Sequence, residues 1–215
     1  MIINAILHIT MFAIAATFHE LAHAWAAHKC GDDTSKNQGR ITLNPLAHID
    51  PFGTVIIPLT LALSGANFIF GWAKPVEYNP YNLRDRREDE YLIAIAGPVA
   101  NFLQALAGSI TIAVLAKFGI ISTSSMIFTL GILYINTNVV LGVFNLLPVP
   151  PLDGFKVLKF ILPESMEQTF DSIESIGSFI LLFLVISGGL SSIIGPIMGW
   201  FQNIYVGLIF RILRT

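Results

Sequence analysis

Charged residues are scarce in this sequence, at 12% of 215 residues, about half of the roughly 25% that soluble globular chains carry. This scarcity excludes a disordered chain, a nucleic-acid binder and an ordinary soluble enzyme. The formal net charge is only −2, so the chain as a whole favours neither acidic nor basic partners. Hydrophobic residues make up 54% of the chain, and the mean hydropathy is +0.70. The composition therefore predicts an integral membrane protein that contacts the lipid bilayer.

Cysteine is almost absent, since Cys30 is the single one. One cysteine excludes an intrachain disulfide framework and a Cys-rich zinc site. The sequence also lacks internal repeats, low-complexity tracts and any polar stretch long enough for an appended soluble domain. The first 25 residues lack a basic region and a clear small-residue cleavage site, so we expect a retained helix there rather than a signal peptide.

Several apolar segments approach the roughly 20 mostly apolar residues that a spanning helix needs. They are residues 2–28, 91–118, 124–147, 172–187 and 190–210. Residues 153–165 are predicted to form a short amphipathic surface helix, and residues 40–44 and 72–78 to form short strands. The predicted fold class is an all-α polytopic membrane protein with about five transmembrane helices and a membrane-associated β-hairpin or re-entrant segment.

The apolar segment 53–70 is ambiguous because it contains Pro58, Gly65 and Asn67. If it enters the membrane without crossing it, and the N-terminus is outside, only Lys117 among the Lys and Arg residues lies outside. The others then lie on the cytoplasmic side: Lys29, Lys36, Arg40, Lys74, Arg84, Arg86, Arg87, Lys156, Lys159, Arg211 and Arg214. Because Lys and Arg are enriched in cytoplasmic loops, this distribution favours a segment that does not cross.

The first apolar segment contains the motif His19-Glu20-Leu21-Ala22-His23. Positions i and i+4 share one face of a helix, so two imidazoles can converge on one Zn²⁺ while Glu20 lies beside the water on the metal. The alternative is a few buried polar residues satisfied by their neighbours. Ionisable groups inside a membrane helix are costly and usually functional. The motif therefore predicts a metal site that includes His19 and His23.

A catalytic zinc site has three protein ligands, so a third residue is needed. The candidates are Asp153, His48, Asp50 and His8. Asp153 follows a Pro cluster that ends the preceding span and frees side chains to enter a cavity, although it could equally cap the next helix. If segment 53–70 does not cross, Asp153 reaches the membrane side where the two histidines lie, which favours it over the others.

Three motifs together resemble the site-2 protease family of intramembrane zinc metalloproteases. They are H-E-L-A-H at 19–23, G-P-V-A-N at 97–101 and N-L-L-P-V-P-P-L-D-G at 145–154. Two further stretches, R-I-T-L-N-P-L-A-H-I-D-P-F-G at 40–53 and G-W-A-K-P-V at 71–76, are similar to the compact prokaryotic branch, which has no PDZ or CBS domain. The resemblance implies that His19, His23 and Asp153 bind one Zn²⁺ per chain, with Glu20 as general base and Asn145 helping at the substrate carbonyl.

These observations predict a zinc metalloendopeptidase that cuts transmembrane segments of other proteins, in regulated intramembrane proteolysis. The expected location is the cell membrane, with the active site toward the cytoplasm. Residues 1–165 are predicted to form the catalytic core and residues 166–215 a C-terminal transmembrane hairpin. The strand-like segments are expected to pair with an unwound substrate by β-augmentation, or to form only a structural hairpin. A zinc-binding scaffold or chaperone that does not cut is the alternative, a metal transporter is a weaker one, and the oligomeric state stays open.

Overall fold

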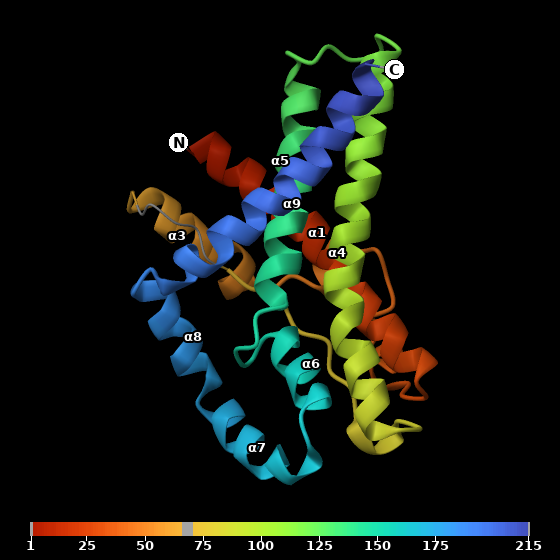
Figure 1. Cartoon of the computed structure of the whole chain (residues 1–215), viewed down its shortest axis with the longest axis vertical. Coiled ribbons are helices and arrows are strands. Elements are labelled where there is room, and N and C mark those ends of the chain that lie inside the picture. Colours follow the sequence, from red (N-terminus) through yellow and green to blue (C-terminus); the bar gives the residue numbers. More distant parts are fainter. Residues whose placement is uncertain (1, 66–70, 215) are drawn as a thin grey trace.

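The computed structural model describes residues 2–65 and 71–214. Within these ranges the chain is helical and contains no strand (Figure 1). The α-helices are α1 (Ile2–Lys29), α2 (Thr34–Asn37), α3 (Ile57–Leu63), α4 (Arg86–Lys117), α5 (Met126–Asn145), α6 (Asp153–Ile161), α7 (Glu167–Ser175), α8 (Gly177–Ile186) and α9 (Gly189–Arg214). Four short turns of other helix types connect them: η1 (Pro45–Ala47), η2 (Pro51–Ile56), η3 (Pro80–Asn82) and η4 (Glu164–Met166). The all-α part of the predicted fold class is therefore confirmed for the described residues.

Helix α4 lies at the centre of the fold and packs against α1, α5, α6 and α9. The core between α4, α5 and α9 is apolar and includes Ile112, Ile135, Val139 and Ile209. The buried residues of α1 are mostly alanines, and the buried residues of α4 include Ala94 and Gly97. Small residues let two membrane helices approach closely. This close approach brings the polar residues of α1 against the middle of α4.

Three helices, α1, α4 and α5, are long and apolar enough to cross a membrane, and a fourth span is possible if the bent pair α7–α8 counts as one. That pair was expected to be a single span over 172–187, but its axis bends by 55°. The bend lies where a Cβ on Gly177 would overlap Pro150, so α8 begins against the loop after α5. The total of about five spans stays a prediction.

The β-hairpin predicted from residues 40–44 and 72–78 does not form in the described chain. Residues 71–79 belong to no helix or strand, and their hydrogen-bond partners are loops and side chains rather than a neighbouring strand. The Lys74 N–H donates to the His48 carbonyl at 2.8 Å, and the Lys74 carbonyl accepts from the Arg40 guanidinium at 2.6 Å. Because Pro75 also lacks an N–H donor, no strand ladder can continue through this stretch.

The residues that directly follow the apolar segment 53–70 contact the residues at its start, whereas residues 66–70 themselves lie outside the described ranges. The Trp72 N–H donates to the Gly53 carbonyl at 3.1 Å, and a Cβ on Gly71 would overlap that carbonyl and Pro58. A straight crossing would separate the two ends by about 30 Å, the thickness of the hydrocarbon core. The ends of this segment therefore lie on one side, as the re-entrant prediction requires.

The Lys and Arg residues are divided less unequally between the two ends of the helical bundle than the sequence predicts. Helix α9 runs parallel to α4, since the Tyr205 hydroxyl bonds to the Phe102 carbonyl at 3.1 Å and Ile209 packs in the same cluster as Ile112. The chain ends beside the C-terminal end of α4 (Figure 1). Arg211 and Arg214 thus lie at the Lys117 end, because the α7–α8 pair is bent and does not carry the chain across first.

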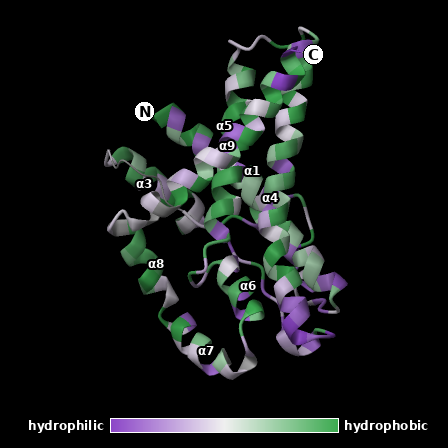
Figure 2. Ribbon diagram, viewed as in Figure 1, coloured by the Kyte–Doolittle hydropathy of each residue, from purple (hydrophilic) through white to green (hydrophobic). Residues whose placement is uncertain are grey.

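Most hydrophilic residues gather at the opposite end, around the start of α4 (Figure 2). With Lys117, Arg211 and Arg214 at one end, nine of the 12 Lys and Arg residues remain on elements at the other. These elements are in contact: the Arg84 N–H donates to the Cys30 carbonyl at the end of α1. The excess of Lys and Arg at this end, which suggests how the protein is oriented in the membrane, is smaller than predicted but still favours the same end.

Candidate metal centre

The buried face of α1 carries the histidines of the motif. Its buried residues include Ala16, His19, His23 and Ala27, spaced by three or four positions and therefore on one side of the helix. His19 is 6% exposed and His23 is 8% exposed. The local sequence thus determines that both imidazoles leave the same face of α1 and point into the protein.

Asp153 is the first residue of α6, which lies beneath the end of α5 (Figure 1). A Cβ on Gly154 would lie 2.6 Å from the Leu147 carbonyl oxygen, so only glycine allows the first turn of α6 to pack this closely on the α5 end. At its other end, α6 is held on α4, where Arg87 donates to the Phe160 carbonyl at 2.9 Å. These contacts bring a residue 130 positions away from His23 to the histidines.

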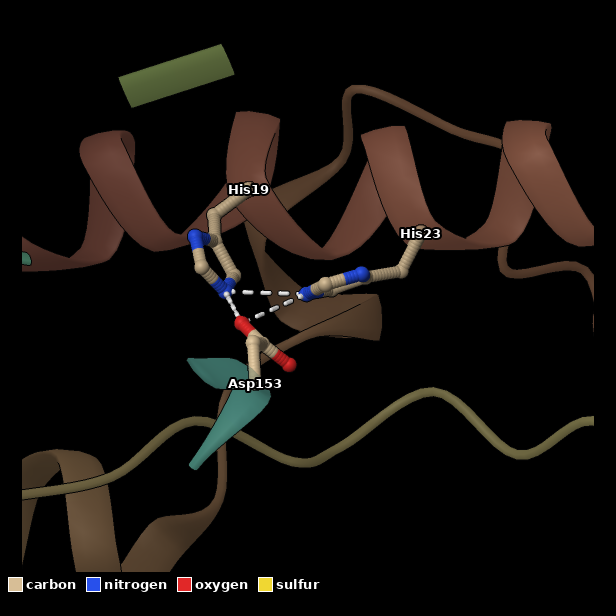
Figure 3. Close-up of side chains that lie close together, drawn as sticks. All are labelled: His19, His23 and Asp153. Carbon is tan, nitrogen blue, oxygen red and sulfur yellow. Dashed lines mark hydrogen bonds and ion pairs between the residues drawn. The ribbon is translucent and has the colours of Figure 1, made fainter. Parts of the chain in front are cut away.

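The three side chains converge on one point (Figure 3). The His19 Nε2 lies 3.2 Å and the His23 Nε2 3.3 Å from the Asp153 Oδ2, and the two Nε2 atoms are 3.0 Å apart. Among the residues that the structure describes, this is the one group of at least three His, Cys, Asp or Glu residues whose ligand atoms lie within 4.8 Å of one another. We call His19, His23 and Asp153 the donor cluster.

The protonation pattern of the donor cluster suits a cation. The His23 Nδ1 lies 2.7 Å from the Ile93 carbonyl, which can only accept, so Nδ1 carries the proton of the neutral ring and Nε2 has a free electron pair. The His19 Nδ1 similarly faces the Asn101 Oδ1 at 2.6 Å. The Asp153 Oδ2 is buried and has no hydrogen-bond partner. Two imidazole nitrogens and a carboxylate oxygen, each with a lone pair facing the others, fit Zn²⁺.

Gly97 of α4 lies directly against both imidazoles. A Cβ at this position would be 2.6 Å from the His19 Nε2 and would also overlap the His23 Nε2. A glycine here lets α4 cover the cluster without displacing either ring. The G-P-V-A-N motif therefore contributes to the site because Gly97 has no side chain, in addition to its contribution to helix packing.

Glu20 is 9% exposed and lies between the two histidines in the sequence of α1. Its Oε2 accepts a hydrogen bond of 2.9 Å from the Val76 N–H. Arg40 holds the segment that contains Val76 by donating hydrogen bonds to the Lys74 and Pro75 carbonyls. The Arg40 side chain is 3% exposed. The carboxylate of Glu20 is thus oriented by the backbone of a segment far away in sequence.

Asn145 lies at the end of α5, and its amide donates to the Leu141 carbonyl of the same helix at 3.0 Å. This bond satisfies a carbonyl of the helix end, which is the structural alternative to a catalytic role. The role of Asn145 at a substrate carbonyl stays a prediction.

The other candidates for the third ligand have structural partners instead. The His48 Nε2 lies 3.0 Å from the Thr42 carbonyl, and Asp50 caps η2 by accepting from the Gly53 N–H at 2.6 Å. His8 bonds through Nδ1 to a carbonyl one turn earlier on its own helix. Of the four candidates, the structure brings only Asp153 to the histidines.

Sequence reasoning missed one residue of this centre, and the motif resemblance alone did not give the role of another. Asn101 belongs to the G-P-V-A-N motif and accepts from His19. Asn138 was not singled out, yet it bonds to Asn101 at 2.9 Å and is fully buried. The available signal was an amide within an apolar membrane segment, where polar side chains usually have a function.

Several ionisable groups outside the spans have shifted pKa values, among them Lys156 and Cys30. Burial by itself lowers the pKa of Lys156, but its interactions with Tyr78 and Asp153 outweigh this and raise the pKa above its usual value. Lys156 therefore stays charged one turn after Asp153. Burial, and then a hydrogen bond to Asp89, raises the pKa of the Cys30 thiol to about 11. Because the thiolate is the reactive form, Cys30 is expected to be inert.

Comparison with known proteins agrees with this centre. The family model of peptidase family M50 matches residues 7–131 and 104–188. "Putative zinc metalloprotease YwhC" of Bacillus subtilis is 37% identical over 190 residues, which are 86% of this chain and 82% of that protein. "Putative zinc metalloprotease Rip2" of Mycolicibacterium smegmatis is 28% identical over 198 residues, 91% of this chain and 73% of that protein.

A further relative, "Zinc metalloprotease MJ0392" of Methanocaldococcus jannaschii, is 26% identical over 190 residues, 87% of this chain but 44% of its own length. No solved structure matches the chain. The family match covers all three motifs of the predicted resemblance, including the residues of the donor cluster. The chain therefore belongs to peptidase family M50, the family of the site-2 proteases.

Proposed function

We propose that this protein is an intramembrane zinc metalloendopeptidase that hydrolyses peptide bonds within or near transmembrane segments of other membrane proteins. The observation that carries the proposal is the donor cluster, in which three lone-pair donors face one another beside Glu20. The family and the names of the relatives support a zinc-dependent peptidase. The apolar helices around the cluster support a substrate that lies in the membrane.

In the proposed mechanism the donor cluster holds the metal through both Nε2 atoms and the Asp153 carboxylate. Zn²⁺ at such a site supplies a Lewis acid for the scissile carbonyl and lowers the pKa of a water toward about 7. Glu20 accepts the proton of the attacking water and returns it to the leaving amine nitrogen. The Val76 N–H holds one carboxylate oxygen of Glu20 and leaves the other for this transfer.

Two auxiliary roles belong to the same proposal. Asn145 would donate its amide to the developing oxyanion, which requires it to give up its bond to the Leu141 carbonyl. An unwound substrate would align beside residues 71–79, close to Glu20, which accepts from the Val76 N–H. In β-augmentation, an extended peptide binds by pairing with exposed backbone N–H and C=O groups.

The first test is metal-dependent cleavage by the purified full chain in proteoliposomes with a model single-pass substrate. A chelator is expected to abolish cleavage, because the donor cluster alone provides no electrophile, and added Zn²⁺ should restore it. The readout is product formation on a gel together with the zinc content of the same sample. A chain that binds zinc and the substrate but never cuts it would contradict the proposal and favour the scaffold function.

We further propose that the end of the bundle with the donor cluster faces the cytoplasm, because nine of the 12 cationic residues lie there and Lys and Arg mark cytoplasmic loops. Single cysteines at positions 36, 86, 123 and 214 in a Cys30→Ser background test this arrangement. A membrane-impermeant thiol reagent applied to intact cells is expected to label positions 123 and 214, and to leave 36 and 86 unlabelled.

Each deviation in this labelling has a defined meaning. Labelling of position 86 without position 36 would show that segment 53–70 crosses the membrane. Protection of position 214 would place the end of α9 opposite Lys117, against the packing of Ile209 beside Ile112. Labelling after permeabilisation is the control that all four cysteines are reactive.

A further inference from the structure

Two asparagines lie directly behind His19, where α1, α4 and α5 meet. Both Asn101 and Asn138 are 0% exposed. The Asn101 Oδ1 lies 2.6 Å from the His19 Nδ1, and its Nδ2 donates to the Asn138 Oδ1 at 2.9 Å. The Asn138 Nδ2 in turn donates to the Tyr134 carbonyl at 3.0 Å. One chain of hydrogen bonds thus connects the α5 backbone to a residue of the donor cluster.

The donor and the acceptor of every hydrogen bond in this series follow from the Tyr134 carbonyl at its end. The Tyr134 carbonyl can only accept, so Asn138 must turn its NH₂ toward it and its oxygen toward Asn101. Asn101 must then present its own NH₂ to Asn138 and its oxygen to His19. The His19 Nδ1 can bond to that oxygen only as an N–H donor, which leaves the electron pair of the neutral ring on Nε2. The backbone of α5 therefore determines that the proton of the neutral His19 ring is on Nδ1 and that the lone pair on Nε2 faces the other two donors.

The two histidines are oriented by different means. His23 donates to the Ile93 main-chain carbonyl, which no substitution removes. His19 depends on two side chains, of which Asn138 belongs to a different helix and to none of the three motifs. Its neighbours Ile135 and Val139 on α5 are buried and apolar. A buried amide in such surroundings is costly unless it is bonded, and an apolar pair at 101 and 138 would pack these helices without that cost.

We infer that Asn101 and Asn138 are positioning residues for the metal site, acting as a relay that fixes the orientation of His19 and so raises the affinity for Zn²⁺. The inference rests on the proposed metal-binding role of the donor cluster. Groups that orient a metal-ligating histidine commonly change metal affinity by about 10- to 100-fold when they are removed. The relay extends this influence to Asn138, whose described hydrogen bonds go to Asn101 and Tyr134 rather than to the donor cluster.

The test measures Zn²⁺ affinity of the purified full chain in detergent, by competition with a chelator. Asn101→Leu keeps the branching of the side chain and removes the acceptor, and we expect about 10- to 100-fold weaker zinc binding. Asn138→Leu should weaken binding by a smaller but measurable factor, because Asn101 can then rotate. Asn101→Asp should retain most of the affinity, because a carboxylate oxygen still accepts from the His19 Nδ1–H.

Gln104→Leu is the matched control for helix packing. Gln104 lies on α4 one turn after Asn101 and also bonds between helices, accepting from the Tyr134 hydroxyl at 2.6 Å, but it has no bond to a histidine. Its variant should bind zinc as the unmodified chain does. In Co²⁺-substituted protein, the visible absorption bands of the ion should change in Asn101→Leu and stay unchanged in Gln104→Leu.

Two results would overturn the relay: normal zinc affinity in Asn101→Leu, or an equal loss in Gln104→Leu. If Asn101→Leu does not fold, Asn138→Leu decides, and normal affinity in that variant overturns the relay. His19→Ala separates this inference from the proposed site. Normal zinc affinity in His19→Ala would refute the donor cluster itself, whereas loss there with normal affinity in Asn101→Leu would refute the relay alone.

Discussion

Glu20→Gln is expected to reduce cleavage of a model transmembrane substrate by at least about 100-fold, which is the scale of losing a general base. The amide has nearly the shape of the carboxylate, and its oxygen can still accept from the Val76 N–H that now bonds to Glu20. The fold and the donor cluster should therefore stay intact, and zinc content should stay at one ion per chain. Turnover in proteoliposomes and zinc measured on the same preparation check both halves of this expectation.

Glu88→Gln is the control, because it neutralises an exposed carboxylate in the first turn of α4, outside both the donor cluster and residues 71–79. This variant should cut at the normal rate. If Glu20→Gln also turned over substrate at nearly the normal rate, Glu20 would not be the base and the proposed mechanism would be wrong. If Glu20→Gln lost zinc as well, the loss of cleavage could not be assigned to proton transfer.

Asp153→Ala is expected to weaken zinc binding by more than about 100-fold, beyond the effect of removing a group that only orients a ligand. The physical reason is that the substitution removes the one anionic member of the donor cluster, whose Oδ2 lies within 3.3 Å of both Nε2 atoms. Cleavage should fall in parallel at limiting zinc. Zinc content after dialysis and affinity by chelator competition measure this loss.

Asp171→Ala is the matched control, since it removes an exposed carboxylate that pairs with Lys159 at 2.5 Å and lies outside the donor cluster. It should bind zinc normally. Unchanged zinc binding in Asp153→Ala would show that the third ligand is elsewhere, and His48, with a buried Nδ1 that has no hydrogen-bond partner, would be the next residue to test.

The long-range contacts explain where the sequence predictions stop. Residues 71–79 have the composition of a strand, but their hydrogen bonds go to Arg40, His48 and Glu20, so the predicted β-hairpin does not form. Local β propensity describes a suitable surface rather than a partner strand. The predicted side of Arg211 and Arg214 was wrong for a similar reason. Counting membrane crossings assumes that each apolar segment is straight, whereas the α7–α8 pair is bent by 55°.

The membrane class, the helical periodicity that puts His19 and His23 on one face, and the family all follow from the amino-acid sequence, because composition, an i, i+4 spacing and contiguous motifs are local properties. Which acid joins the histidines depends on tertiary packing, since the close contact of Gly154 with the end of α5 brings Asp153 to them. Tertiary packing alone also decides what orients the ligands, because Asn138 and Val76 reach His19 and Glu20 only through the packing of separate segments. No local sequence pattern predicts these contacts, because they depend on how helices far apart in the chain pack together.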